Sequence, residues 1–240
     1  MRSIQPCRSM LRVVRAHCLV AVLTTGLFLI LGLGPRALAA HVEPLRNSRV
    51  LTTAAQVRAL SEAEAFQRHP VKLRGVVTLV FLRGLVFMQD ETGGVIVNAS
   101  FDTSQLSPGD VIEVEGVSDY GFVVPRVTPT NWRRRGRAPL PEPVRISSDD
   151  LVAGRHVCEW VEMEGVVRSA SIGPDRRPML RVDMGARVVE VQLVDVHREE
   201  GRGEEGRALV DARVRVRGVV ASFVNERRQL IETYVRTSGR

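Results

Sequence analysis

Val71-Lys72-Leu73-Arg74-Gly75-Val76 is the first of four short segments that share one pattern. The other three are Ile112-Glu113-Val114-Glu115-Gly116-Val117, Val161-Glu162-Met163-Glu164-Gly165-Val166 and Val214-Arg215-Val216-Arg217-Gly218-Val219. Apolar and charged residues alternate in each segment, which predicts a β-strand with one buried face. Each segment then reaches a glycine, where a barrel strand can bend or bulge. Four such strands indicate an all-β protein.

The charges of these four segments predict which strands are neighbours. The first segment is basic and the second acidic, whereas the third is acidic and the fourth basic. Opposite charges that face each other across two strands stabilise the pair modestly. We therefore predict two successive small barrels, each of which pairs its first segment with its second.

The remaining segments repeat one order of elements around these strands. In the first repeat we expect strands over residues 71–80, 85–89, 95–98 and 111–118, with a fifth within 122–137. In the second we expect strands over 159–169, 179–183, 188–194, 212–221 and 229–236. Capping residues predict short helical turns over 54–60, from Ser61 onward and over 149–153. The turn at 90–94 contains Asp90, which we interpret as a turn residue rather than a carboxylate pair or calcium ligand.

The N-terminus predicts a targeting segment. Four arginines and no acidic residue precede an apolar run over residues 19–34, and Ala37-Leu38-Ala39 has the small-x-small pattern of a signal-peptidase site. The run is shorter than the roughly 20 residues that a membrane span requires. We predict a signal peptide over 1–39 and a periplasmic or extracellular protein. An uncleaved membrane anchor is the alternative.

The predicted domains follow from these elements. A linker with short helices covers residues 40–69, and the first barrel covers 70–138. A Pro-rich connector with a short helical turn covers 139–157, and the second barrel covers 158–237. The connector begins Pro139-Leu140-Pro141-Glu142-Pro143, which favours a stiff, extended chain.

These residues resemble the OB-fold, a five-stranded Greek-key barrel whose first strand pairs with its fourth. The resemblance is carried by residues 71–77 followed by 85–97. More closely, residues 50–236 resemble the tandem OB-like region outside the membrane in some bacterial sensor histidine kinases. Its carrying segments are 51–61, 87–90, 136–141 and 160–167. The resemblance implies two tandem OB-like barrels and a sensor role. Such kinases continue into a membrane helix and a kinase core, which the sequence to Arg240 does not contain.

Charge and chemistry narrow the function classes. Five of the 34 basic residues lie in 1–39, which leaves 29 against 27 acidic residues and argues against strong attraction of nucleic acid. Four histidines lie beyond the leader, none with a Cys, Asp or Glu at the spacing of a known metal-ligand motif, and no nucleophile motif is present. Cys158 is the only cysteine outside the leader, and we interpret it as a small buried residue rather than a reactive thiol. We therefore predict no enzyme activity, metal or cofactor.

One cluster has the composition of a nucleic-acid surface. Trp132 precedes Arg133, Arg134 and Arg135, and an aromatic ring beside arginines can stack on a base and contact phosphate. OB barrels bind ligands along strands two and three and the adjoining loops, where Arg83 and Phe87 would lie. The alternatives are that the arginines form a solvated strand edge and that Phe87 belongs to the core.

Two functions from different classes follow. The first is an exported, non-enzymatic binding or sensor module with an unknown ligand or protein partner, for which a sensor kinase is one candidate. The second is an exported protein that binds single-stranded nucleic acid or another polyanion through Trp132 and its neighbours. In both, the membrane is contacted only through the N-terminal segment, if that segment is uncleaved.

Overall fold

The structure, a computed structural model, describes residues 49–81, 84–99, 101–121, 123–173, 176–194, 206–224 and 230–238. The predicted signal peptide therefore lies outside the described residues. Within them, strands dominate and helices are short, and no described helix is long and apolar enough to cross a membrane.

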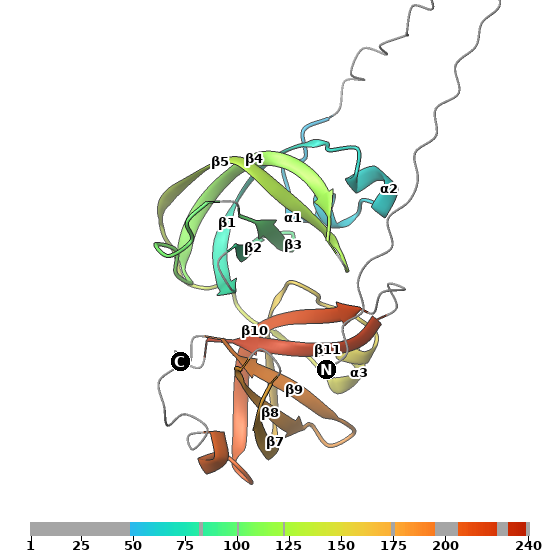
Figure 1. Cartoon of the computed structure of the whole chain (residues 1–240), viewed down its shortest axis with the longest axis vertical. Coiled ribbons are helices and arrows are strands. Elements are labelled where there is room, and N and C mark those ends of the chain that lie inside the picture. The colour runs from blue at the N-terminus through green and yellow to red at the C-terminus, as the bar shows by residue number, and fades with distance from the viewer. Residues whose placement is uncertain are drawn as a thin grey trace, which may run out of the picture. The chain divides into compact units, whose positions relative to one another are not determined.

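The first five strands close into a barrel (Figure 1). They are β1 (Pro70–Phe81), β2 (Leu85–Asp90), β3 (Gly93–Asn98), β4 (Asp110–Tyr120) and β5 (Pro125–Arg137), in the order β1-β2-β3-β5-β4. Pairing of β1 with β4 closes the barrel, and β3 and β5 run parallel. The inward residues, among them Leu73, Val86, Met88 and Ile112, form its core. This order confirms the OB-like fold predicted from the sequence.

The second barrel repeats this order. Its strands are β7 (Trp160–Ile172), β8 (Pro178–Asp183), β9 (Val188–Leu193), β10 (Arg213–Val224) and β11 (Leu230–Thr237). They follow the order β7-β8-β9-β11-β10, and β10 also pairs with β7. A two-residue strand, β6 (Val144–Arg145), adds to β7 in parallel. The parallel pair β9–β11 corresponds to β3–β5 of the first barrel.

The predicted charge register is confirmed in both barrels. Lys72 and Arg74 lie opposite Glu115 and Glu113. Glu164 and Glu162 lie opposite Arg215 and Arg217, whereas Arg213 faces Val166. Gly75, at the end of the charged segment of β1, is required because β2 passes close to it. A Cβ at this position would lie 2.6 Å from the Gln89 carbonyl oxygen.

Short capped helices precede both barrels, two before the first and one before the second. Helix α1 (Ala54–Arg58) begins after Thr53, α2 (Glu62–Ala65) after Ser61 and α3 (Ser148–Val152) after Ser147. Each cap residue forms a capping box with the residue three positions later. Before α1, Leu51 bridges Val71 in parallel, as β6 does with β7 before α3. The sequence did not predict these parallel additions.

A third hydrophobic cluster joins the two barrels. Leu79, Phe81 and Phe87 of the first barrel pack with Cys158, Trp160 and Val219 of the second. The backbone N–H of Trp160 donates to Gln89 Oε1 at 2.8 Å. A Cβ on Gly94 would lie 1.9 Å from the Cys158 carbonyl oxygen, so glycine is needed for this contact.

An ionic cluster lies at the same junction. Arg58 of α1 donates to Glu159 Oε1, and His156 Nδ1 lies 2.8 Å from Glu159 Oε2. Both His156 and Cys158 have positive φ, at 60° and 70°. Arg68 has a φ of 57° two residues before β1, as Cys158 does two residues before β7. The repeat therefore extends to the backbone conformation of the entry turn.

The strand register explains why the β1–β2–β3 face of the first barrel is covered by the second barrel, whereas the equivalent β7–β8–β9 face is not covered in this way. Across that face, Leu79, Phe87 and Ile96 lie side by side. The equivalent residues of the second barrel are Ser169, Arg181 and Glu190. Large apolar side chains need cover from water, whereas the polar set tolerates exposure.

Candidate functional site

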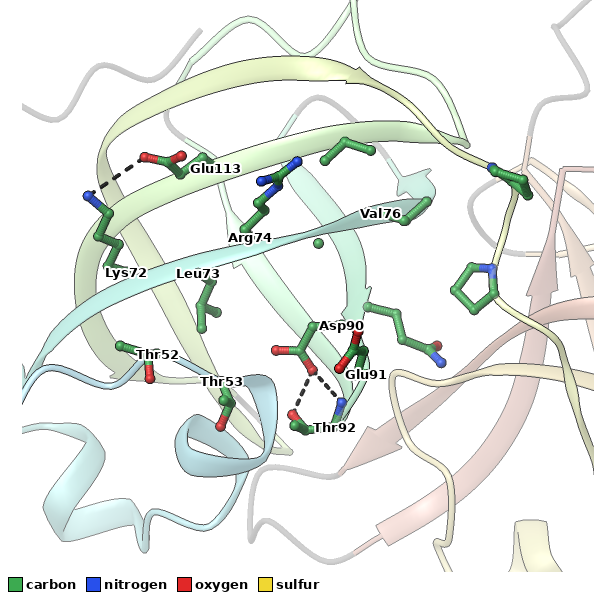
Figure 2. Close-up of a pocket in the computed structure, with 15 residues that line it drawn as sticks. Thr52, Thr53, Lys72, Leu73, Arg74, Val76, Asp90, Glu91, Thr92 and Glu113 are labelled. Carbon is green, nitrogen blue, oxygen red and sulfur yellow. Dashed lines mark hydrogen bonds and ion pairs between the residues drawn. The ribbon is translucent and has the colours of Figure 1, made fainter.

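A groove of about 740 Å³ opens beside the first half of β1 (Figure 2). Thr52 and Thr53, before α1, form one side, and residues 89–92 at the β2–β3 turn form another. Glu113 of β4 and the connector prolines Pro139 and Pro141 complete the lining. This size falls within the range of small-ligand sites, which is roughly 300–1,000 Å³.

The groove lies where β1 has a neighbour on one side only. β4 pairs with residues 70–76 of β1, and β2 pairs with 76–81 on the opposite side. Leu51 accepts from Lys72 N–H and donates to the Pro70 carbonyl, both at 2.8 Å. Among the described strand pairings, none covers residues 73–75 on the edge of β1 that faces away from β4. This gap in the sheet is the floor of the groove.

Asp90 holds one wall of the groove in place. Its Oδ1 accepts from the N–H and the hydroxyl of Thr92, at 2.8 and 2.6 Å (Figure 2). Its Oδ2 accepts from the Ala54 N–H at 2.8 Å, at the start of α1. The turn role predicted for Asp90 is therefore correct, and this carboxylate also ties the turn to the helix.

The charged groups of the groove are unequally satisfied. Lys72 Nζ lies 2.8 Å from Glu115 and 3.7 Å from Glu113, and Figure 2 draws the second contact. The hydrogen bond to Glu115 and the charges of both carboxylates raise the pKa of Lys72. The same hydrogen bond lowers the pKa of Glu115.

Arg74 lacks the ion pair that its register position offers. Its cross-strand neighbour Glu113 instead contacts Lys72 and accepts from Arg135 at 3.0 Å. Within the described part of the chain, no carboxylate lies within 4.0 Å of the exposed Arg74 guanidinium. A cation that faces a groove without a partner can receive an anionic group of a ligand.

The structure does not gather the predicted ligand-binding residues into one site. Phe87 is 1% exposed and packs between the barrels, which agrees with the core alternative. Trp132 is half-buried, packs against the first core and stacks on Phe101 at 4.5 Å between ring centroids. Arg83 lies outside the described residues.

The arginines after Trp132 mostly contact neighbouring strands. Arg134 binds the buried carboxylate of Asp110 at 2.7 Å, and Arg137 reaches the same oxygen at 3.2 Å. Arg135 binds Glu113, and Arg133 lies opposite Glu113 in register. This pattern fits the alternative of a charged strand edge.

The described residues offer no metal-binding cluster, and their cysteine is buried. No group of three or more His, Cys, Asp or Glu side chains there could hold a metal ion. Burial raises the pKa of the Cys158 thiol to about 12, which makes it unreactive.

Sequence reasoning missed the groove residues Arg74 and Thr92. The missed signal is the combination of two features. One is a long first strand that must change partners at Gly75, and the other is an Asp-x-Thr turn beside a helix start. Neither indicates a groove alone, because its walls come together only in the fold.

No protein-family model and no curated protein matches the chain. Among solved structures, the hypothetical protein YgiW of E. coli has 20% identity and a TM-score of 0.28, over 35% of this chain and 88% of that one. The tetrameric p202 HIN2 structure has 13% identity and a TM-score of 0.33, over 72% and 89%. A murine DNA-binding protein bound to double-stranded DNA has 13% identity and a TM-score of 0.33, over 70% and 90%.

Proposed function

We propose that the chain is an exported, non-enzymatic binding module whose ligand site is the groove beside β1. The observation that carries the proposal is the gap at residues 73–75, where an open strand edge and Arg74, which has no ion pair with a described carboxylate, face one groove. The leader sequence supports export. The two barrels supply a rigid scaffold, on which a binding site is held more accurately than on mobile loops.

A sensor role is supported by where the groove lies. Gln89 lines it and also accepts the Trp160 N–H of the second barrel. Pro139 and Pro141 line it and belong to the connector. A ligand in the groove would therefore touch groups that join the barrels. Binding that favours one arrangement of this junction would shift the population of the whole molecule.

The binding proposal is tested by titrating the ¹⁵N-labelled chain with a panel of amino acids, sugars, dicarboxylates and short peptides. A true ligand shifts the amide resonances of Arg74, Gly75 and Thr92. Arg74→Gln weakens that binding, and the matched variant Arg213→Gln, on an exposed strand position far in sequence, does not. If no compound of the panel shifts these amides, the groove is not the site.

Nucleic acid is tested separately with a fluorescent single-stranded oligonucleotide. Since Trp132 already stacks on Phe101 and three nearby arginines are paired, we expect weak binding that Trp132→Ala leaves unchanged. Tight binding at physiological salt that Trp132→Ala weakens by about 1–3 kcal/mol would replace our proposal with a nucleic-acid function.

Export is tested by mass spectrometry of the protein in the extracytoplasmic fraction. We expect a new N-terminus near Ala40, because signal peptidase cleaves after small residues such as Ala39. An intact Met1 in the membrane pellet would indicate a retained anchor instead.

A further inference from the structure

We propose that the groove binds an extended, acidic protein segment as an added strand against β1, an inference that rests on the proposed function. Arg74 would form both the main-chain hydrogen bonds and the charged contact. An extended peptide adds to a sheet in this way when an open edge presents main-chain donors and acceptors beside a suitable side-chain contact.

The main-chain groups of Arg74 point to the groove. In a β-strand, alternate residues direct their N–H and C=O to the same side. Lys72 N–H and the Pro70 carbonyl both bind Leu51, so residues 70, 72 and 74 face this side. Pairing with β2 resumes only at Val76 opposite Gln89. An incoming strand therefore has a donor and an acceptor at Arg74.

The charge of Arg74 selects the incoming side chain. Its neighbour Lys72 already has Glu113 and Glu115, and Glu113 also has Arg135. Arg74 is the groove cation that the described carboxylates leave without an ion pair. A Glu or Asp in the added strand would supply one, through a charge-assisted hydrogen bond.

The second barrel provides an internal comparison. β6 and β8 leave the same gap along β7, between Glu162 and Val166. There the residue equivalent to Arg74 is Glu164, which binds Arg215 at 2.8 Å. The backbone gap is repeated, but its side chain is already paired. We therefore place the peptide site in the first barrel only.

The experiment measures binding of the full chain to acetyl-Ser-Val-Glu-Val-Ser-amide by calorimetry, with a matched peptide that carries Gln for Glu. We expect the Glu peptide to bind about tenfold more tightly, because a charged hydrogen bond is stronger than a neutral one. Arg74→Gln should abolish this preference. Arg213→Gln, the matched exposed arginine of β10, should preserve it.

Main-chain pairing is tested with two N-methylated peptides, one methylated at Glu and one at the following Val. Methylation removes a backbone donor. Because successive residues of a strand direct their N–H groups to opposite sides, one of the two peptides should lose about tenfold in affinity while the other binds normally. Equal binding of the Glu and Gln peptides, or indifference to both methylations, would overturn the inference. If no peptide binds while another compound of the panel shifts the Arg74 and Gly75 amides, the peptide inference fails and the proposed function stands.

Discussion

Arg74 and Glu164 occupy equivalent positions of the two barrels and differ in one ion pair. Glu164 binds Arg215, whereas the corresponding partner of Arg74 is engaged by Lys72 and Arg135. A difference of one contact separates a strand position that is satisfied within the fold from one that is free to bind. At the scale of single residues, the proposed site rests on this departure from the repeat.

Cys158 should be unreactive while the protein is folded. Burial raises the pKa of its thiol to about 12, and the side chain is 1% exposed between the barrels. In a full-length chain with Cys7→Ser and Cys18→Ser, a thiol reagent at pH 8 should label Cys158 only after denaturant is added. Rapid labelling of the native protein would mean that the junction opens.

Glu159 should make the junction weaker in acid. Burial raises the pKa of Glu159, but the hydrogen bonds from Arg58 and His156 and their charges outweigh burial and lower it below its ordinary value of 4.5. A lowered folded pKa gives stability that is present above about pH 4.5 and is lost as the pH falls through the folded value.

Urea unfolding at pH 7 and pH 3.5 tests this expectation. Glu159→Gln should reduce stability at pH 7 and make the loss between the two pH values smaller than in the wild type. The matched variant Glu142→Gln, in the connector, should leave the pH dependence unchanged. A Glu159→Gln variant with the wild-type pH dependence would show that this carboxylate does not link folding to pH.

At the scale of elements, the alternation of charge and apolar residues carried most of the predictable information. Every predicted strand exists, with ends shifted by a few residues. The pairing of Arg215 with Glu164 follows because period two fixes the face and charge fixes the partner. The groove was not predictable, because the sequence of β1 does not indicate at which residue its pairing with β2 ends.

Reversal of one cross-strand charge tests the register energetically. Arg215→Glu places like charges opposite Glu164, and should cost about 0.5–1 kcal/mol because the Arg215–Glu164 pair is exposed and screened. Addition of Glu164→Arg should recover part of the loss in thermal or urea melts. Arg213→Glu, opposite Val166, should show no such coupling with Glu164→Arg. Additive single and double mutants at positions 215 and 164 would contradict the pairing.

At the scale of the molecule, the junction was the feature that sequence reasoning missed. Phe87 was assigned either to a ligand face or to a core, and it belongs to a core that two barrels share. A signal was present, because outward positions of β1 to β3 hold Leu79, Phe81, Leu85 and Ile96, where a solvated face would carry polar residues. The partner that covers them lies more than sixty positions away, and periodicity gives no information about it.

The shared core predicts that the barrels unfold together. The chain has two tryptophans, Trp132 in the first barrel and Trp160 in the second. Trp132 reports on the first barrel, and Trp160 reports on the start of β7 at the shared core, each by fluorescence in a variant with the other tryptophan replaced by Phe. The two urea curves should have the same midpoint, within the small shift caused by each substitution. Separate midpoints, with the first barrel persisting alone, would show that the junction contributes little.

The apolar face of β1, β2 and β3 has a consequence for solubility. A fragment that ends at Arg137 would leave Leu79, Phe81 and Phe87 in water, on a curved sheet with no cover. Contiguous exposed apolar surface of this kind promotes self-association. The second barrel covers this face with Cys158, Trp160 and Val219, while its own β7–β9 sheet carries the polar residues Ser169, Arg181 and Glu190 at the equivalent positions. The second barrel thus acts within the chain as a built-in solubilising partner for the first.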